Sequence, residues 1–261
     1  RKPGAMLDGQ TAIITGASRG IGAATAERFA ELGGNVTIAA RSDAIHDTVE
    51  RIGGDQALAV RTDVSAEGDV EDAISATVDR FGGLDCVVNN AAIAGPTARV
   101  ENTPSDGWQE TLDVNITGAF YMCKHSVPHL RESDRASIVN ISSITGKRPL
   151  PERIGYAVTK IGLIGMSRTL AFELGDDGIT VNTICPGTVR TERLRRVFET
   201  HAEEMGVTYQ EALDEIVLDQ CAIPELQEPE EVAEMIALLA SEFGRHITAQ
   251  DINVDSGATW Y

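Results

Sequence analysis

The stretch TGASRGIG, residues 15–22, follows a short apolar run rich in isoleucine and precedes an amphipathic segment. Its glycines, Gly16, Gly20 and Gly22, have a spacing that lets a backbone turn tightly and approach a phosphate closely. A helix beginning here would offer that phosphate its free N–H groups and the positive end of its dipole. A tight turn without a ligand could use the same glycines, but the flanking strand and helix favour a dinucleotide-binding loop.

The alternation of strand and helix continues along the chain. Helical patterns cover 21–32, 70–81 and 230–242, and others begin near Ser105 and Ile154. The strands are almost continuous apolar runs, which indicates a sheet covered on both faces. We therefore predict one α/β domain over residues 7–261 with a doubly wound, seven-stranded parallel sheet. Its expected strands are 11–15, 35–40, 57–62, 85–89, 137–141, 180–185 and 251–254.

Residues 191–224 have a helical pattern without a strand, so we expect a helical insertion before the last strand, with a substrate lid over approximately 188–224. The insertion begins with TVRTERLRR, residues 188–196, which holds four arginines in a chain of formal net charge -18. These arginines either form a pocket wall for an anion or pair with Glu192, Glu199 or Glu203 along one solvated helix.

Composition limits the classes of partner. The 261 residues are 42% hydrophobic and 24% charged, as in an ordinary globular protein. The strong negative charge argues against nucleic acid and anionic membranes as partners. No apolar run is long enough to cross a bilayer and no secretory signal is recognisable, so we expect a cytoplasmic protein, with residues 1–6 a remnant before the native start. The four cysteines have no zinc spacing, no metal site is expected, and reduced thiols are favoured over a disulfide pair.

Further motifs resemble those of the short-chain dehydrogenase/reductase family, whose nucleotide loop reads TGxxxGxG. The resemblance covers the chain after Met6. Ala92 departs from the family's NNAG, which narrows the freedom of the backbone there. The other matching residues, in chain order, are Asp63-Val64 after the third strand, Asn89-Asn90-Ala91, Asn115 in DVNITGAF, Ser142-Ser143, Tyr156 and Lys160 as YxxxK, and Pro186-Gly187, Val189 and Thr191 as PGxVxT.

The resemblance implies a Rossmann fold, a homotetramer or homodimer, and an NAD(P)-dependent oxidoreductase that acts on CH–OH groups. It places the cofactor on Gly16, Ser18, Arg19, Gly20, Ile21, Gly22, Arg41, Asp63, Val64, Asn90, Ala91, Tyr156, Lys160, Pro186, Gly187, Val189 and Thr191.

Tyr156 and Lys160 are four residues apart on an expected helix, so they share a face. A tyrosine has a pKa of about 10, and a nearby ammonium group lowers it toward the range of a useful general base. The same pair would be unremarkable on a solvated helix. Ser143 precedes Tyr156 by the family's spacing and would hydrogen-bond the substrate oxygen. Ser142 competes for that role, but strand alternation turns the two serines to opposite faces.

Asn115 resembles the family residue that holds a water between the active-site lysine and solvent. A buried asparagine that bonds the backbone is the structural alternative. Together with Ser143, Tyr156 and Lys160 it completes the expected catalytic set.

The end of the second strand bears on the choice of cofactor. Ala40 stands where NAD-dependent relatives tend to carry aspartate, while Arg19 and Arg41 suit a 2′-phosphate. Asp43 is expected to cap the next helix. We therefore predict NADP(H); the alternative is NAD(H) with Arg41 stacked on adenine.

Three segments should lie beyond the carboxyl ends of the strands, where open α/β sheets bind ligands. They are 92–100, 146–155 and 187–224, and each carries cations. We expect an alcohol or ketone substrate with an anionic group, held by Ser143, Arg148, Arg153 and Arg190; the other cations here are Arg99 and Lys147. The alternatives are an NAD-dependent sugar or polyol dehydrogenase and a non-catalytic dinucleotide sensor on the same fold.

Overall fold

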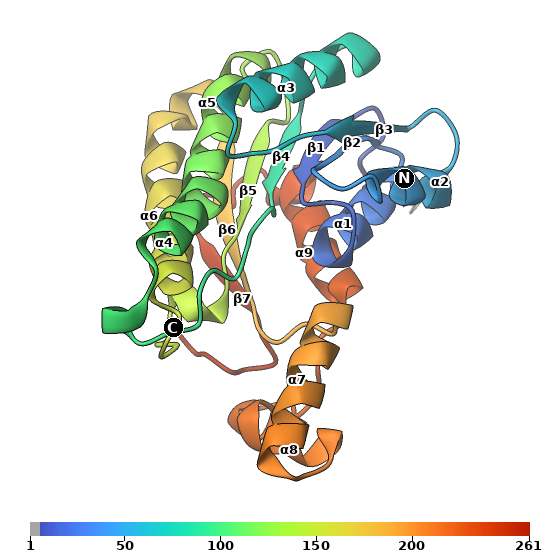
Figure 1. Ribbon diagram of the computed structural model, residues 1–261. Coiled ribbons are helices and arrows are strands. Elements are labelled where there is room, and N and C mark those ends of the chain that lie inside the picture. The colour runs from blue at the N-terminus through green and yellow to red at the C-terminus, as the bar shows by residue number, and fades with distance from the viewer. Residues whose placement is uncertain (1–5) are drawn as a thin grey trace.

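The computed structural model describes residues 6–261, apart from the side chain of Arg193. Residues 1–5 of the expected N-terminal remnant lie outside the described residues. The described residues contain a seven-stranded parallel sheet in the order β3-β2-β1-β4-β5-β6-β7 (Figure 1). The predicted fold class is confirmed. The strands are β1 (Thr11–Thr15), β2 (Asn35–Ala40), β3 (Ala57–Arg61), β4 (Cys86–Asn89), β5 (Ser137–Ile141), β6 (Thr180–Pro186) and β7 (Asp251–Val254).

Helices cover both faces of the sheet (Figure 1). On one face lie α1 (Gly20–Glu31), α2 (Ile45–Ile52) and α9 (Pro229–Ala240), and on the other α3 (Glu67–Phe81), α5 (Gly118–Leu130) and α6 (Ile154–Glu173). Neighbouring strand residues serve opposite layers, because strand side chains alternate. Ile14 packs in the core cluster that includes Phe29, whereas Ile13 packs in the cluster that includes Ile74. Each such burial contributes about 1.5–3 kcal/mol, so both layers are held to β1.

The long helix predicted to begin near Ser105 is divided in the structure. α4 (Ser105–Leu112) runs into one π-helical turn, Asp113–Thr117, before α5 begins. A π turn inserts an extra residue into the hydrogen-bond ladder and is frequent at functional sites. Here it contains Asn115.

The residues between β6 and α9 form the predicted helical insertion. α7 (Glu192–Met205) and α8 (Tyr209–Ile216) extend away from the sheet (Figure 1). They enclose a small core of their own that includes Phe198, Leu213 and Leu226. The insertion therefore packs largely on itself.

Two findings concern the expected environment. In the part of the chain that the structure describes, no helix has the length and apolar character required to span a bilayer. All four cysteines are free thiols, as predicted, and Cys86, Cys123 and Cys185 are buried.

Candidate active site

The glycine loop closes tightly against the end of β4. Gly16 and Gly20 have φ values of 66° and 58°, in the left-handed region that favours glycine. A Cβ at Gly22 would lie 2.6 Å from both Asn90 Nδ2 and Gly16 O. Larger residues would therefore push the loop away from the strand.

Reciprocal hydrogen bonds fix the ends of β1 and β4. Asn90 Nδ2 donates to Thr15 O at 2.9 Å and to Gly16 O at 3.2 Å. In return, Thr15 Oγ1 accepts from the backbone N–H of Asn90 at 3.0 Å and of Ala91 at 3.1 Å. Thr15 is not among the residues predicted to bind the cofactor, although its position directly before Gly16 was an available signal. These bonds hold the point where the strand order reverses, which is where such sheets bind ligands.

A cleft of about 160 Å³ opens beside this loop at the carboxyl ends of the strands. Its lining includes seven of the predicted cofactor residues and seven others. The predicted ones are Gly16, Ser18, Arg19, Arg41, Asp63, Val64 and Ala91; the others are Ala39, Ala40, Ser42, Thr62, Ala92, Ile93 and Val114.

Arg41 and Asp63 both line this cleft, and Arg41 Nη1 lies 3.8 Å from Asp63 Oδ2. Partial burial alone would raise the pKa of Asp63, but hydrogen bonds from Ser65 Oγ at 2.7 Å and Ser65 N at 3.0 Å, with the Arg41 charge, lower it below its ordinary value. Asp63 therefore stays ionised, and the distance to Arg41 exceeds that of a hydrogen bond.

The expectation for Asp43 is wrong. α2 has Ala44 at its N-cap without a side-chain cap, and the carboxylate of Asp43 lies 3.9 Å from Arg61 instead. The backbone carbonyl of Asp43 accepts from His46 N at 3.0 Å, so the main chain makes the bond that the side chain was expected to make.

The PGxVxT turn returns to the glycine loop. Gly187 N–H donates to Val254 O at 2.9 Å and to Gln227 Oε1 at 3.1 Å, which ties the turn to β7. Thr191 caps α7 by accepting from Leu194 N at 3.2 Å. A methyl group at Gly20 would lie 3.7 Å from Thr191 Cγ2. Thr191 and the glycine loop therefore border the same region.

Tyr156 and Lys160 lie on the first turns of α6. Lys160 Nζ is 5.4 Å from the centroid of the Tyr156 ring and donates to Ile141 O at 2.8 Å. The lysine is 3% exposed, and burial lowers its pKa to about 8. The ammonium group is thus available at neutral pH and is lost under moderately alkaline conditions.

The two serines after β5 turn apart, as strand alternation predicts. Ser142 is buried and donates from Oγ to Lys160 O at 2.7 Å. Ser143 is half-buried, and its Oγ accepts from Thr145 N at 3.1 Å. Ser142 therefore supports the lysine-bearing helix, while Ser143 keeps its hydroxyl near the surface of the site.

Asn115 bridges three segments from the π turn. Its Oδ1 accepts from Ile93 N at 2.8 Å, and its Nδ2 donates to Ile93 O at 2.9 Å and to Thr159 Oγ1 at 3.1 Å. Ile93 lines the cleft and Thr159 precedes Lys160. Thr159 was missed, since only the fold brings it to Asn115.

The basic residues that were predicted to lie near the substrate differ in burial and in bonding partner. Arg153 is half-buried, with Cζ 5.7 Å from the Tyr156 ring centroid and Nη2 donating to Ala94 O at 3.0 Å. Arg148 donates to Gln220 Oε1 at 3.0 Å, which joins the loop after β5 to the insertion. Lys147 is 6% exposed in its side chain and pairs with Asp251 at 2.8 Å.

The described arginine side chains of the insertion pair with nearby carboxylates. Arg190 Nε lies 2.7 Å from Glu228 Oε1, and Arg195 lies 3.0 Å from Glu199. Arg196 and Glu192 are 3.9 Å apart. Arg193 has its side chain outside the described part of the structure. Of the two readings of TVRTERLRR, these contacts favour the solvated helix.

Comparisons with known proteins extend over nearly the full chain. A family model described as enoyl-(acyl carrier protein) reductase matches residues 16–259. Glucose 1-dehydrogenase 2 of Bacillus subtilis is 36% identical over 260 residues, covering 98% of this chain and 96% of that protein. D-beta-hydroxybutyrate dehydrogenase of Cupriavidus necator is 30% identical, covering 97% and 98%. A crystal structure from Brucella melitensis, described as a short-chain dehydrogenase/reductase and glucose/ribitol dehydrogenase, has a TM-score of 0.86 at 27% identity and covers 98% of this chain and 99% of that chain.

Proposed function

This chain belongs to the short-chain dehydrogenase/reductase family, and we propose that it interconverts a secondary alcohol and a ketone with Tyr156 as the general acid/base. The family acts on CH–OH groups with a nicotinamide cofactor. One observation carries the proposal: the buried Lys160 ammonium lies 5.4 Å from the Tyr156 ring, on the same face of α6.

Several residues of the chain would share the steps of proton transfer. A bound nicotinamide would supply the hydride transfer. Tyr156 Oη takes the hydroxyl proton during oxidation or gives one during reduction, and the Lys160 ammonium stabilises the phenolate. Ser143 Oγ donates to the substrate oxygen as charge develops there. Asn115 holds the backbone of Ile93 and the hydroxyl group of Thr159 in place. We propose that it also positions a water molecule that relays protons between Lys160 and solvent.

The cleft beside the glycine loop suits the adenosine half of a dinucleotide. It combines the start of α1, apolar Ala40 and Val64, and the ionised Asp63. We propose NADP(H), because Arg19 and Arg41 line this cleft and β2 ends in Ala40 rather than a carboxylate. NAD(H), with Arg41 on adenine, is the alternative.

The cofactor test compares kcat/KM for NADP(H) and NAD(H) in the wild type and in Arg41→Ala. We expect a preference for NADP(H) that falls in the variant, since the 2′-phosphate loses a guanidinium partner. Arg131→Ala is the matched control, because Arg131 is half exposed, pairs with Asp177 and does not line the cleft. A wild-type preference for NAD(H) would reject the proposal.

We propose that the substrate carries an anionic group and that Arg153 contacts it. Arg190 is also a predicted substrate residue, but its guanidinium pairs with Glu228. The guanidinium of Arg153 bonds Ala94 O and lies over the ring of Tyr156, the proposed acid/base. Arg148 would border the same space from the loop after β5. The name of the hydroxybutyrate relative implies a carboxylate substrate, while the glucose relative supports a sugar or polyol as the second candidate.

A panel experiment tests both the activity and the substrate class. Hydroxy acids, keto acids, sugars, polyols and neutral secondary alcohols are assayed for NAD(P)H formation or consumption. We expect turnover that favours acids, with Arg153→Met raising KM for acids more than for neutral substrates. Turnover of sugars alone would favour the second candidate, and cofactor binding without any turnover would favour a non-catalytic sensor.

The lid and the assembly are also proposals. We assign residues 188–224 the role of a substrate lid, because α7 and α8 follow the cofactor turn and pack mainly on their own core. A homotetramer or homodimer is supported by large apolar side chains exposed on α5 and α6, among them Phe120, Ile161 and Phe172. The buried free thiols suit a cytoplasmic location.

A further inference from the structure

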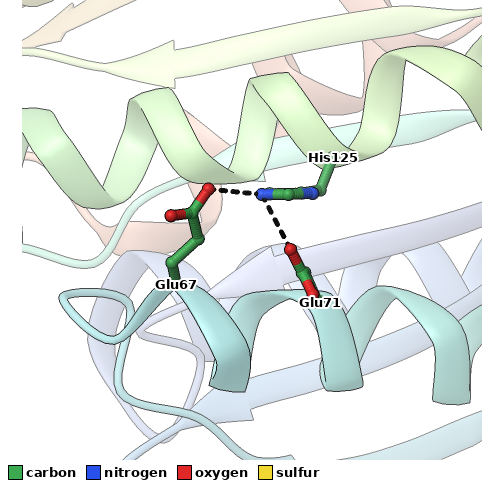
Figure 2. Close-up of side chains that lie close together, drawn as sticks. All are labelled: Glu67, Glu71 and His125. Atoms are coloured by element: carbon green, nitrogen blue, oxygen red, sulfur yellow. Dashed lines mark hydrogen bonds and ion pairs between the residues drawn. The ribbon is translucent and has the colours of Figure 1, made fainter.

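A second group of convergent polar side chains lies between α3 and α5. Glu67 and Glu71 are four residues apart at the start of α3, so their carboxylates share a face of that helix. His125 projects from α5 toward both of them (Figure 2). Its Nε2 lies 2.8 Å from Glu67 Oε1 and 3.4 Å from Glu71 Oε1. The three side chains are absent from the residues that line the cofactor cleft.

We propose that Glu67, Glu71 and His125 bind a divalent transition metal ion, with Zn²⁺ as the best match. One ligand atom from each residue lies within 4.8 Å of the other two. Tetrahedral zinc with ligands at its usual bond lengths separates neighbouring donors by about 3.3 Å, between the two distances observed at His125 Nε2. Small side-chain rotations would therefore place all three donors around one ion.

The donor types select among cations. Carboxylate oxygens alone would suit Mg²⁺ or Ca²⁺, but an imidazole nitrogen shifts the preference toward Zn²⁺, Ni²⁺ or Co²⁺. The His125 side chain is 19% exposed, whereas those of Glu67 and Glu71 are 37% and 57% exposed. The protein thus holds the nitrogen ligand against the helix pair and leaves the carboxylates open to solvent, where water can complete the coordination.

The Lys124 ammonium group already occupies a position beside the Glu67 carboxylate, where a metal ion would bind. Its Nζ lies 2.6 Å from Glu67 Oε1, the same oxygen that lies 2.8 Å from His125 Nε2. Lys124 is half-exposed, so its ammonium group can leave the carboxylate for solvent when an ion arrives. The proposal therefore predicts competition: the lysine and the metal ion use the same oxygen.

The experiment titrates the full-length protein, stripped with a chelator, with ZnCl₂ in a calorimeter. We expect one strong Zn²⁺ site per chain. His125→Ala and Glu71→Gln should each weaken it by about tenfold or more, since even outer partners of metal ligands are worth that much. Lys124→Ala should strengthen it, because Glu67 loses its competing cation. His129→Ala, one turn further along α5, is the matched control and should bind as the wild type does.

A second measurement guards against misfolded variants. Zn²⁺ at about a hundredfold excess over its Kd should raise the melting temperature by about 5 °C or more, because the ion joins α3 to α5 in the folded state only. Each variant should melt as the wild type does in chelator. The proposal is overturned if the wild type shows no saturable site, or if His125→Ala, Glu71→Gln and His129→Ala all bind Zn²⁺ equally.

Discussion

The carboxyl edge of the sheet and the α7–α8 insertion hold their polar side chains in different ways. At the sheet edge, each key side chain bonds the backbone of another segment: Asn90 bonds Thr15, Asn115 bonds Ile93, and Lys160 bonds Ile141. These partners are main-chain atoms of strands or their following loops, which cannot rotate away. The fold therefore holds these side chains in position before a ligand binds.

In the insertion the arginines pair with side chains. Arg190, Arg195 and Arg196 face carboxylates, and the side chains of all three are more than half exposed. Exposed ion pairs of this kind are worth about 0–1 kcal/mol and exchange readily with water. A region held in this way can move as a lid, and its charges tolerate substitution. Four predictions test the contrast, in order of decreasing effect.

Replacing Tyr156 with phenylalanine should have the largest effect. The variant keeps the ring over Lys160 but removes the group that carries the proton, so we expect kcat to fall by about 10²–10⁴-fold. NADPH affinity, followed by fluorescence titration, should stay close to the wild-type value. Tyr209→Phe on α8 is the matched control and should leave kcat unchanged. If Tyr156→Phe kept most of the activity, the acid/base assignment would be wrong.

The buried lysine predicts an unusual pH dependence of stability. The pKa of Lys160 is about 8 in the folded state and 10.5 in its reference state. Between these pH values the unfolded chain holds a proton that the folded chain has released, so the free energy of unfolding rises with pH. Relative to Lys160→Met, the wild type should gain about 3 kcal/mol across this window, measured by urea unfolding.

Lys124→Met supplies a control of opposite sign. The hydrogen bond to Glu67 raises the pKa of Lys124, so its contribution to stability is present below the unfolded pKa and is lost as pH rises through the folded one. Identical pH profiles for wild type and Lys160→Met would contradict the buried-ammonium account.

A methyl group in the glycine loop should have an intermediate effect. In Gly22→Ala the new Cβ would lie 2.6 Å from Asn90 Nδ2 and from Gly16 O. This clash would displace the Asn90 side chain, whose hydrogen bonds join the ends of β1 and β4. We expect a loss of about 1–3 kcal/mol in stability together with weaker NADPH binding. Gly165→Ala on α6 meets no atom within 4 Å and should stabilise the helix by about 0.5–1 kcal/mol. Thermal melts with and without NADPH distinguish the two outcomes.

The same contrast explains what the sequence could predict. The strands, the loop at Gly16 and the Tyr156–Lys160 pair follow from local patterns: apolar runs, a glycine spacing and a helical interval. Each needs only a few neighbouring residues to be recognised. Their bounds in the structure differ from the expected ones by a residue or so at β3, β4 and β6.

The parts that were missed depend on distant partners. The π turn around Asn115 accompanies bonds to Ile93 and Thr159, 22 and 44 residues away along the chain. Arg190 meets Glu228 across 38 residues. No local pattern encodes such pairs. The sequence could therefore predict that several arginines and lysines lie near the site, but not which of them would be paired with a carboxylate.

Arg190→Ala should have the smallest effect, and it tests whether the insertion is as tolerant as its exposed pairs suggest. The Arg190–Glu228 pair is about half exposed on both sides, so stability should change by about 1 kcal/mol or less. KM for an acidic substrate should rise less than in Arg153→Met, because Arg190 is held by Glu228 whereas Arg153 lies against Tyr156. A selective, large rise in KM for acids in Arg190→Ala would instead mean that the ion pair opens when the lid closes, and that the sheet edge and the insertion share the recognition of the anion.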